Sequence, residues 1–204
     1  MGQRCAWVGT DPLYIAYHDD EWGVPERDSK ALYAKLVLDG FQAGLAWITI
    51  LRKREGFRRA FDGLDPDRVA EWGEPEVERC LADPGIVRHR GKIQAAIGNA
   101  RAWQRIEAGR GFSGFLWDFV DGVPLQNAPA SLAEIPAQTP LAASISKALK
   151  QEGFTFCGPT IVYAFMQAVG MVNDHVVDCP RFADLAGDEP DAGPLRQPSG
   201  GAPG

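Results

Sequence analysis

The stretch Asn173-Asp174-His175-Val176-Val177-Asp178-Cys179 places a histidine and a cysteine four residues apart, near the end of the patterned part of the chain. Side chains at i and i+4 share one face of a helix, so both can reach a single point. Imidazole nitrogen and thiolate sulfur are both good ligands for zinc. Because two ligands do not complete a zinc site, this stretch predicts partners elsewhere in the chain.

A second histidine and cysteine, Cys5 and His18, lie 13 residues apart at the opposite end of the sequence. Four such ligands complete a tetrahedron and leave no open position, which is typical of a structural ion. The spacing differs from that of a standard zinc finger, and two hydrogen-bonded histidines with two buried thiols would give the same pattern. Cys80 and Cys157 have no histidine close by in the sequence, and we interpret them as small buried thiols.

The length of 204 residues predicts one domain, or two small ones that share a core. No apolar run approaches the length of a membrane span, and the first residues lack the core of a signal peptide. We therefore expect a cytoplasmic protein whose four cysteines are thiols or metal ligands and not disulfides. The segment from Asp188 to the end has 8 Pro or Gly in 17 residues, so we expect a disordered tail over 188–204.

The charge is unevenly distributed. The net charge of −6 argues weakly against a nucleic-acid partner, yet residues 47–105 carry 12 Lys and Arg against 9 Asp and Glu. A basic middle between acidic ends is compatible with a local anion-binding face. Scattered, solvated charges on exposed helices would explain the same numbers.

Apolar periodicity, capping residues and prolines predict an all-α fold. Helices are expected over about 28–40, 42–54, 90–107, 141–149 and 159–168, with short helices beginning at Pro66 and Pro75. No segment shows the alternation of a strand, and there is no internal repeat. The opening through Arg27 lacks a long helical period, so an irregular N-terminal segment is expected to pack against the helices.

Aromatic residues gather with one carboxylate in the first 50 residues. The set comprises Trp7, Tyr14, Tyr17, Trp22, Trp47 and Asp39. Several aromatic faces and one carboxylate suit a flat, electron-poor ring, since the faces stack on it and the carboxylate accepts from its donors. Tryptophan in a small helical protein is more often part of the core, and this is our interpretation of Trp72, Trp103 and Trp117.

A two-glycine connection joins the last two long helices expected from the sequence. It contains Gly153, Gly158 and Thr160, and Lys147 and Lys150 lie just before it. Such a turn can aim backbone N–H groups at a phosphate, and the N-terminus of the following helix adds its dipole. A joint that serves only packing would have the same sequence.

Four sequence runs, taken together, resemble one family. They are Asp11–Asp19 with Glu21–Pro25, then Gln42–Leu45, Arg88–Ile93 and Val172–His175. They are similar, in register over about residues 3–179, to bacterial DNA-3-methyladenine glycosylase, type I, the constitutive enzyme.

The resemblance implies a helix-hairpin-helix DNA glycosylase fold over 1–187, with two helical lobes that share the base pocket and the hairpin at Gly153–Gly158. It implies that Cys5, His18, His175 and Cys179 bind one structural zinc ion that ties the N-terminal segment to the C-terminus. Tyr17, Trp22 and Trp47, with Trp7 and Tyr14, would line the pocket, and Asp39 and Tyr17 would be the catalytic pair. Gly153, Gly158 and Thr160 would contact the DNA backbone.

The implied activity is repair of double-stranded DNA that contains alkylated bases, by a cytoplasmic, nucleoid-associated monomer. The enzyme flips 3-methyladenine from the duplex and hydrolyses its glycosidic bond, which leaves an abasic site. Many members of the superfamily use an aspartate after the hairpin, and Asn173 stands in its place here, as is known for this family. N3-methylation makes the base cationic and hence a good leaving group, so no strong general acid is required.

Three residues depart from the family pattern. Asp39 replaces the usual glutamate that reads the base, Ala46 replaces a serine, and Phe41 is larger and more apolar than expected. We expect all three at the pocket wall, with an altered affinity or range of lesions. The competing interpretations are a protein that binds alkylation damage without cleaving it and a zinc hydrolase, which would need an open coordination position.

Overall fold

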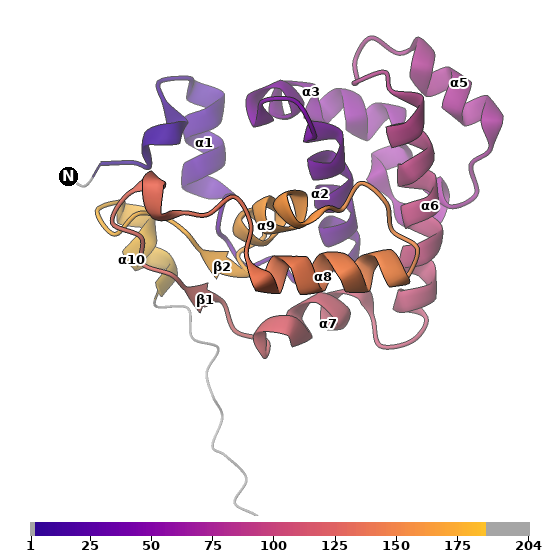
Figure 1. The fold of residues 1–204 in the computed structure, drawn as a ribbon. Coiled ribbons are helices and arrows are strands. Elements are labelled where there is room, and N and C mark those ends of the chain that lie inside the picture. Colours follow the sequence, from indigo (N-terminus) through magenta and orange to yellow (C-terminus); the bar gives the residue numbers. More distant parts are fainter. Residues whose placement is uncertain (1–2, 187–204) are drawn as a thin grey trace, which may run out of the picture.

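The structure is a computed structural model that describes residues 3–186. It is an assembly of helices, as expected for an all-α fold (Figure 1). The α-helices are α1 (Pro12–Asp20), α2 (Ser29–Gln42), α3 (Trp47–Ala60), α4 (Pro66–Val69), α5 (Glu74–Ala82), α6 (Arg90–Glu107), α7 (Phe112–Trp117), α8 (Pro140–Gln151), α9 (Pro159–Ala168) and α10 (Pro180–Ala186). The 3-10 helices are η1 (Ala6–Val8), η2 (Asp62–Leu64), η3 (Asp118–Val120) and η4 (Leu132–Glu134).

Helix α2 lies among α3, α6, α7 and α9, and this position explains why it is buried over most of its length (Figure 1). Its N-cap residue is Asp28, whose carboxylate accepts a hydrogen bond from the Ala31 N–H at 2.8 Å. At its other end the buried ammonium of Lys92 donates to the carbonyls of Phe41 and Ala43, at 2.9 and 2.7 Å. A cation on the last carbonyls of a helix satisfies them and complements the dipole.

The boundary between α2 and α3 differs from the prediction. Helix α2 continues through Gly40 to Gln42, and α3 begins only at Trp47. Asp39 therefore sits inside the last turn of α2 and not at its end. The sequence prediction was wrong because glycine is a weak helix breaker when its neighbours are packed.

The N-terminal segment contains one helix that periodicity did not reveal. In α1 the Asp11 carboxylate accepts from the backbone N–H groups of Leu13 and Tyr14, and Pro12 stands at the first helical position. Acidic and apolar residues are mixed around this helix, so it has no apolar stripe. The Asp-Pro start signal was nevertheless present in the sequence.

One short strand pair also departs from the expectation of helices alone. Strands β1 (Leu125–Gln126) and β2 (Val172–Asn173) pair in parallel, with Leu125 opposite Val172. Two residues are too few to show alternation, so sequence pattern could not predict them.

The two ends of the described chain meet. Residues 174–179 form turns and not a helix, and α10 follows, so His175 and Cys179 approach each other through a loop. Gly170 (φ +70°) closes α9 against the N-terminal segment, where an added Cβ would lie 2.5 Å from the Pro25 nitrogen. Only glycine fits this contact. The predicted tail over 188–204 lies outside the described residues.

The interior contains the residues expected there. Trp72, Trp103 and Trp117 are buried, and so are Cys80 and Cys157. None of the helices in the described part of the chain is long and apolar enough to cross a membrane.

Candidate functional site

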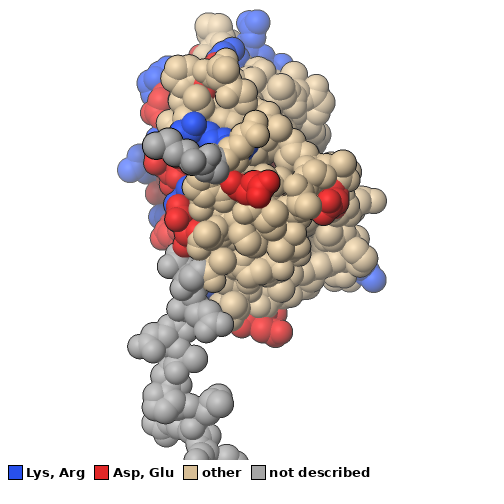
Figure 2. All heavy atoms as spheres, turned by 90° about the vertical axis from the view of Figure 1, so that its left-hand side faces the viewer, with Lys and Arg blue, Asp and Glu red and all other residues tan. Residues whose placement is uncertain are grey.

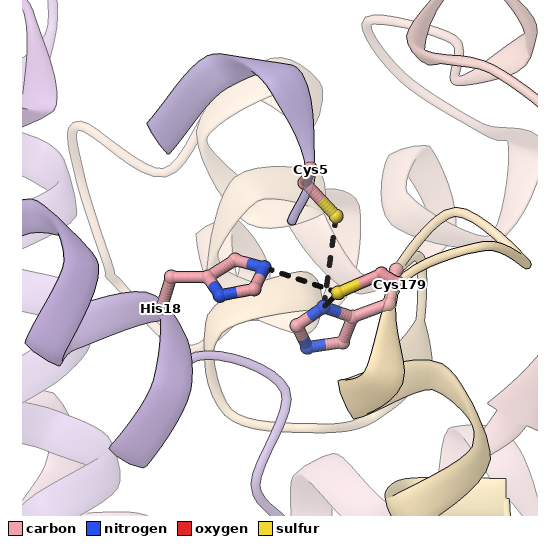
Figure 3. Close-up of side chains that lie close together, drawn as sticks. Cys5, His18 and Cys179 are labelled. Atoms are coloured by element: carbon pink, nitrogen blue, oxygen red, sulfur yellow. Dashed lines mark hydrogen bonds between the residues drawn. The ribbon is translucent and has the colours of Figure 1, made fainter. Parts of the chain in front are cut away.

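Four buried side chains from the two ends of the chain converge on one point. Cys5 precedes η1, His18 comes from α1, and Cys179 comes from the segment before α10 (Figure 3). His175 comes from the same segment as Cys179. Their ligand atoms all lie within 4.8 Å of one another. The Cys179 Sγ is 3.6 Å from both His18 Nε2 and His175 Nδ1, and Cys5 Sγ is 3.6 Å from His175 Nδ1.

The second nitrogen of each histidine has a fixed partner outside the cluster. His18 Nδ1 is 2.8 Å from an oxygen of Asp19, and His175 Nε2 is 3.1 Å from the Trp22 carbonyl oxygen. Each outer nitrogen donates to these acceptors, which leaves the inner nitrogen unprotonated and facing the sulfurs. Metal-binding histidines are oriented in the same way by carboxylates and carbonyls. The guanidinium of Arg4 in turn forms an ion pair with the Asp19 carboxylate, with Arg4 Nη2 2.7 Å from Asp19 Oδ2.

The cluster fits a tetrahedral metal ion. Bonds of about 2.3 Å to sulfur and about 2.0–2.1 Å to nitrogen separate the two ligand atoms by about 3.6 Å in a regular tetrahedron. The three sulfur–nitrogen distances given above have this value. Burial raises the pKa of the Cys5 thiol to about 12 and lowers the pKa of His175 to about 4. Without a metal, burial thus keeps Cys5 and His175 uncharged, and a cation would favour the thiolate form that binds it.

The cluster touches an aromatic wall. The Trp22 ring stands edge to face against His175, with centroids 4.5 Å apart, and Trp7 lies 5.4 Å from His18 in the same manner. Trp7 in turn packs against Tyr14 and Trp22, at 5.0 and 5.1 Å. The two histidines of the cluster therefore support the rings directly.

A cavity of about 300 Å³ opens on the other side of these rings. It lies among α1, α2, α3 and α9, with the segment around η4 on its rim. Its lining comprises Trp7, Tyr14, Tyr17, Trp22, Lys35, Asp39, Gln42, Trp47, Leu132, Ile135, Ala164, Gln167 and Ala168. All six members of the aromatic and acidic set expected from the sequence are present. The cavity suits a flat aromatic ligand.

The polar groups of the cavity are incompletely satisfied. Asp39 is 1% exposed, and its Oδ1 accepts from the Lys35 ammonium at 2.5 Å. Asp39 Oδ2 and Trp47 Nε1 are buried and find no hydrogen-bond partner among the described residues. Buried polar atoms are almost always paired, so an unpaired acceptor and an unpaired donor in one cavity indicate a missing ligand.

Burial sets the ionisation of the other groups. It raises the pKa of Asp39, against the opposing effect of Lys35, and lowers the pKa of Lys35, against that of Asp39. It raises the pKa of Tyr17 well above its ordinary value, with Asp39 adding to the shift, so the hydroxyl stays protonated and can donate.

Two of the three departures from the family pattern do not line the cavity. Phe41 is buried in the main core against Phe57 and Phe61, with centroids 4.7 and 5.7 Å away. Ala46 is exposed at the start of α3, where it makes no side-chain cap. The prediction that both lie at the pocket wall was wrong, since neither lines the cavity. Phe41 is two residues after Asp39 on α2 and so points in a different direction.

Asn173 and Asp174, the polar residues just before His175, do not line the cavity themselves. The Asn173 amide donates to Gln126 Oε1 at 2.8 Å and to the Phe182 carbonyl at 3.1 Å. The carboxylate of Asp174 accepts from Gln167 Nε2 at 2.7 Å and so orients a side chain that lines the cavity. Lys35, Gln42 and Gln167 are the polar lining residues that sequence reasoning missed. Lys35 stands four residues before Asp39 on one helix face, which was the available signal.

Helices α8 and α9 form a hairpin that carries the two predicted glycines. Gly153 (φ +99°) follows α8, and Gly158 is the residue before α9, with Pro159 and Thr160 in its first turn. The first N–H groups of α9 therefore point out of the turn. Lys147, Lys150 and Pro159 line one shallow hollow on this hairpin, and both lysines are exposed.

The face that carries α1 and α10 is mostly uncharged. Figure 2 shows acidic groups scattered over it and both signs of charge together at one edge. In this view the described residues form no broad basic surface.

Comparison with known proteins gives concordant matches. The family model for methyladenine glycosylase matches residues 7–182. The chain is 56% identical to DNA-3-methyladenine glycosylase 1 of Escherichia coli over 178 residues, 87% of this chain and 95% of that protein. It is 46% identical to DNA-3-methyladenine glycosylase of Haemophilus influenzae, over 88% of this chain and 98% of that protein.

Solved structures agree. The 3-methyladenine DNA glycosylase I of Staphylococcus aureus, solved to explain 3-methyladenine recognition, is 40% identical with a TM-score of 0.84. The match covers 87% of this chain and 95% of that one.

Proposed function

The chain belongs to the methyladenine glycosylase family, and on that premise we propose how its residues excise 3-methyladenine from alkylated DNA. The observation that carries the proposal is the aromatic cavity with its unpaired acceptor, Asp39 Oδ2, and unpaired donor, Trp47 Nε1. A purine edge offers both donors and acceptors, so it complements this pair. The product of the reaction is an abasic site, the first intermediate of base excision repair.

The aromatic residues bind the base and the polar residues orient it. Trp47 and Tyr17, with ring centroids 5.4 Å apart, form one wall, and Trp7, Tyr14 and Trp22 form another. Asp39 accepts a hydrogen bond from the amino group of the base. Its side chain is one methylene shorter than the glutamate usual in the family. We therefore expect this chain to differ from its relatives in its affinity for the base and in the range of lesions that it excises.

The chemistry is a hydrolysis that the substrate itself favours. Base flipping costs less for a damaged base, and N3-methylation places a positive charge on the leaving group. As the C1′–N9 bond breaks, its electron pair neutralises the base; water oxygen bonds to C1′ and its proton passes to solvent. Asp39 and the protonated hydroxyl of Tyr17 position the nucleotide and the water at this step. No lysine adduct is formed, so the enzyme is monofunctional.

The helical hairpin is the proposed contact with the DNA backbone. The turn residues Gly153 and Gly158, together with Thr160 at the start of α9, offer N–H groups to a phosphate. Lys147 and Lys150 stand beside them and supply positive charge. This arrangement supports a helix-hairpin-helix motif that binds a duplex independently of sequence. It is also compatible with a monomer, since one chain carries both pocket and hairpin.

Zinc is the proposed occupant of the cysteine–histidine cluster. Cys5, His18, His175 and Cys179 would hold it, and the ion would stabilise the fold without taking part in the reaction. Four protein ligands fill a tetrahedral shell, which argues against a zinc hydrolase. Cobalt substitution tests this, because four protein ligands give the spectrum of a tetrahedral centre with no exchangeable water.

A base-release assay tests the activity. Purified protein is incubated with methylated duplex DNA, and released bases are identified by mass. We expect the wild type to release 3-methyladenine catalytically. The rate of release should fall strongly in Asp39→Asn and Tyr17→Phe, and in Asp39→Glu it should equal or exceed that of the wild type. Asp118→Asn, an exposed carboxylate far along the chain, serves as the control. Stoichiometric binding without release would instead support a damage-binding protein.

A further inference from the structure

The base cavity contains a positive charge of its own. The Lys35 side chain is 17% exposed and lines the cavity beside Asp39, one turn further along α2. Its ammonium lies 4.1 Å from the centroid of the Trp47 ring and 2.5 Å from Asp39 Oδ1. The lysine thus makes a cation–π contact and an ion pair at the same point.

A cationic base requires the same two partners. Stacking on Trp47 and pairing with Asp39 are the interactions that a flat, positively charged ring would make in this cavity. Lys35 already uses the ring face and one carboxylate oxygen. The ammonium and the carboxylate also cancel each other, so the cavity offers no net attraction to a further positive charge.

A second hollow offers the Lys35 ammonium an alternative position. Lys35 also lines this second hollow of about 720 Å³, whose other charged lining residues are five carboxylates and four cations: Asp20, Glu21, Glu26, Asp62 and Asp65, with Lys30, Arg54, Arg58 and Arg68. Glu21 is held there by Arg54 at 2.5 Å. A rotation of the lysine toward this hollow would clear the Trp47 face and leave Asp39 to pair with a cationic base.

We propose that Lys35 is a specificity-determining residue: an internal cation that competes with a positively charged base for Trp47 and Asp39 and so reduces the preference for cationic over neutral bases. The proposal rests on the proposed function, because it assumes that the flipped base occupies this cavity. A neutral base suffers no charge repulsion from the ammonium, whereas an N3-methylated purine that is still attached to its sugar does, because it is cationic. The lysine therefore widens the range of bases that this pocket accepts.

The test compares one cationic and one neutral ligand. The 3,9-dimethyladeninium ion imitates the methylated nucleotide, with a methyl group in place of the sugar, and 3-methyladenine is the neutral free base. Dissociation constants at neutral pH follow from quenching of tryptophan fluorescence in wild type, Lys35→Met and Lys35→Arg. Lys30→Met, an exposed lysine of the same helix paired with Asp65 and Asp67, is the matched control.

Lys35→Met should raise the ratio of cation affinity to neutral-base affinity by at least about tenfold, equivalent to about 1.4 kcal/mol. Lys35→Arg and Lys30→Met should leave this ratio within about twofold of the wild type, since each keeps the net charge of the cavity. An unchanged or lower ratio in Lys35→Met would overturn the proposal. The proposal would also be overturned if Lys35→Met lost base release while its ratio of cation affinity to neutral-base affinity stayed unchanged. The ammonium would then be part of the chemistry.

A parallel assay separates the two levels of inference. If wild type releases 3-methyladenine from methylated DNA but the ratio does not respond to Lys35→Met, the role of Lys35 alone is wrong. If wild type neither releases nor binds methylated adenine, the proposed function is wrong and the role of Lys35 is wrong with it.

Discussion

Replacing Cys179 by serine should remove the metal and loosen the join between the two ends of the chain. The cluster links Cys5 to His175 across 170 residues of sequence. Closing a loop of that length restricts the unfolded chain by about 5 kcal/mol, by the relation used for disulfide cross-links. This is an upper limit, because a metal also binds cysteine and histidine in the unfolded state.

The control for this change is built into the chain. Cys157 is as deeply buried as Cys179 but lies outside the cluster, so Cys157→Ser measures the cost of burying a hydroxyl group alone. For a protein of this size, each kcal/mol lowers Tm by about 2–4 °C. If half of the upper limit is realised, Cys179→Ser should unfold at least about 5 °C below Cys157→Ser.

Two measurements decide the matter. Zinc content by mass spectrometry should be one ion per chain in wild type and Cys157→Ser, and near zero in Cys179→Ser. A strong chelator should lower Tm in the first two proteins and leave the third unchanged. The metal site would be refuted if the two serine variants had equal Tm values and the wild type contained no metal after growth in zinc-supplemented medium. The cluster would then be held only by thiol–imidazole hydrogen bonds.

Four other outcomes are expected. His175→Ala should weaken 3-methyladenine binding and lower Tm together, because Trp22 packs on that imidazole; unchanged Tm with full affinity would contradict this. Ala46→Ser should add the missing cap of α3 and stabilise the protein by about 0.5–2 kcal/mol in thermal unfolding. Lys92→Met should cost about 2–3 kcal/mol in denaturant unfolding, because two carbonyls at the end of α2 lose a charged donor. Asp11→Ala should destabilise α1 at neutral pH, and the difference from wild type should vanish in acid.

The sign of the last prediction follows from the Arg52 guanidinium, which donates to Asp11 and lowers the pKa of that carboxyl. A depressed folded-state pKa gives stability that is fully present above the ordinary value of about 4 and is lost as pH falls through the folded value. Urea unfolding of wild type and Asp11→Ala at neutral and acid pH checks it. A difference that persists in strong acid would show that the ionised carboxylate is not the cause.

Local signals in the sequence accounted for most of the helices and for the parts of the site. Helix α6 (Arg90–Glu107) follows its apolar stripe and cap, and α9 (Pro159–Ala168) begins at its proline as expected. The boundary of α2 was harder, since Gly40 reads as a stop and only packing against neighbouring helices carries the helix past it. The pairing of β1 with β2 could not be predicted from local pattern, because the paired residues lie 47 positions apart in the sequence.

The sequence by itself determined the chemistry available: two histidines, two cysteines, a set of aromatic rings and Asp39, in a chain patterned for helices. These follow from residue type and local spacing, which a single sequence displays directly. The tertiary structure decided where each side chain points. It brought the four ligand atoms within 4.8 Å through a loop and not along a helix, and sent Phe41 into the core.

The structure alone also put the Lys35 ammonium on the Trp47 ring. The physical reason is that contacts between distant segments are chosen by the packing of the whole core, and no local pattern records them.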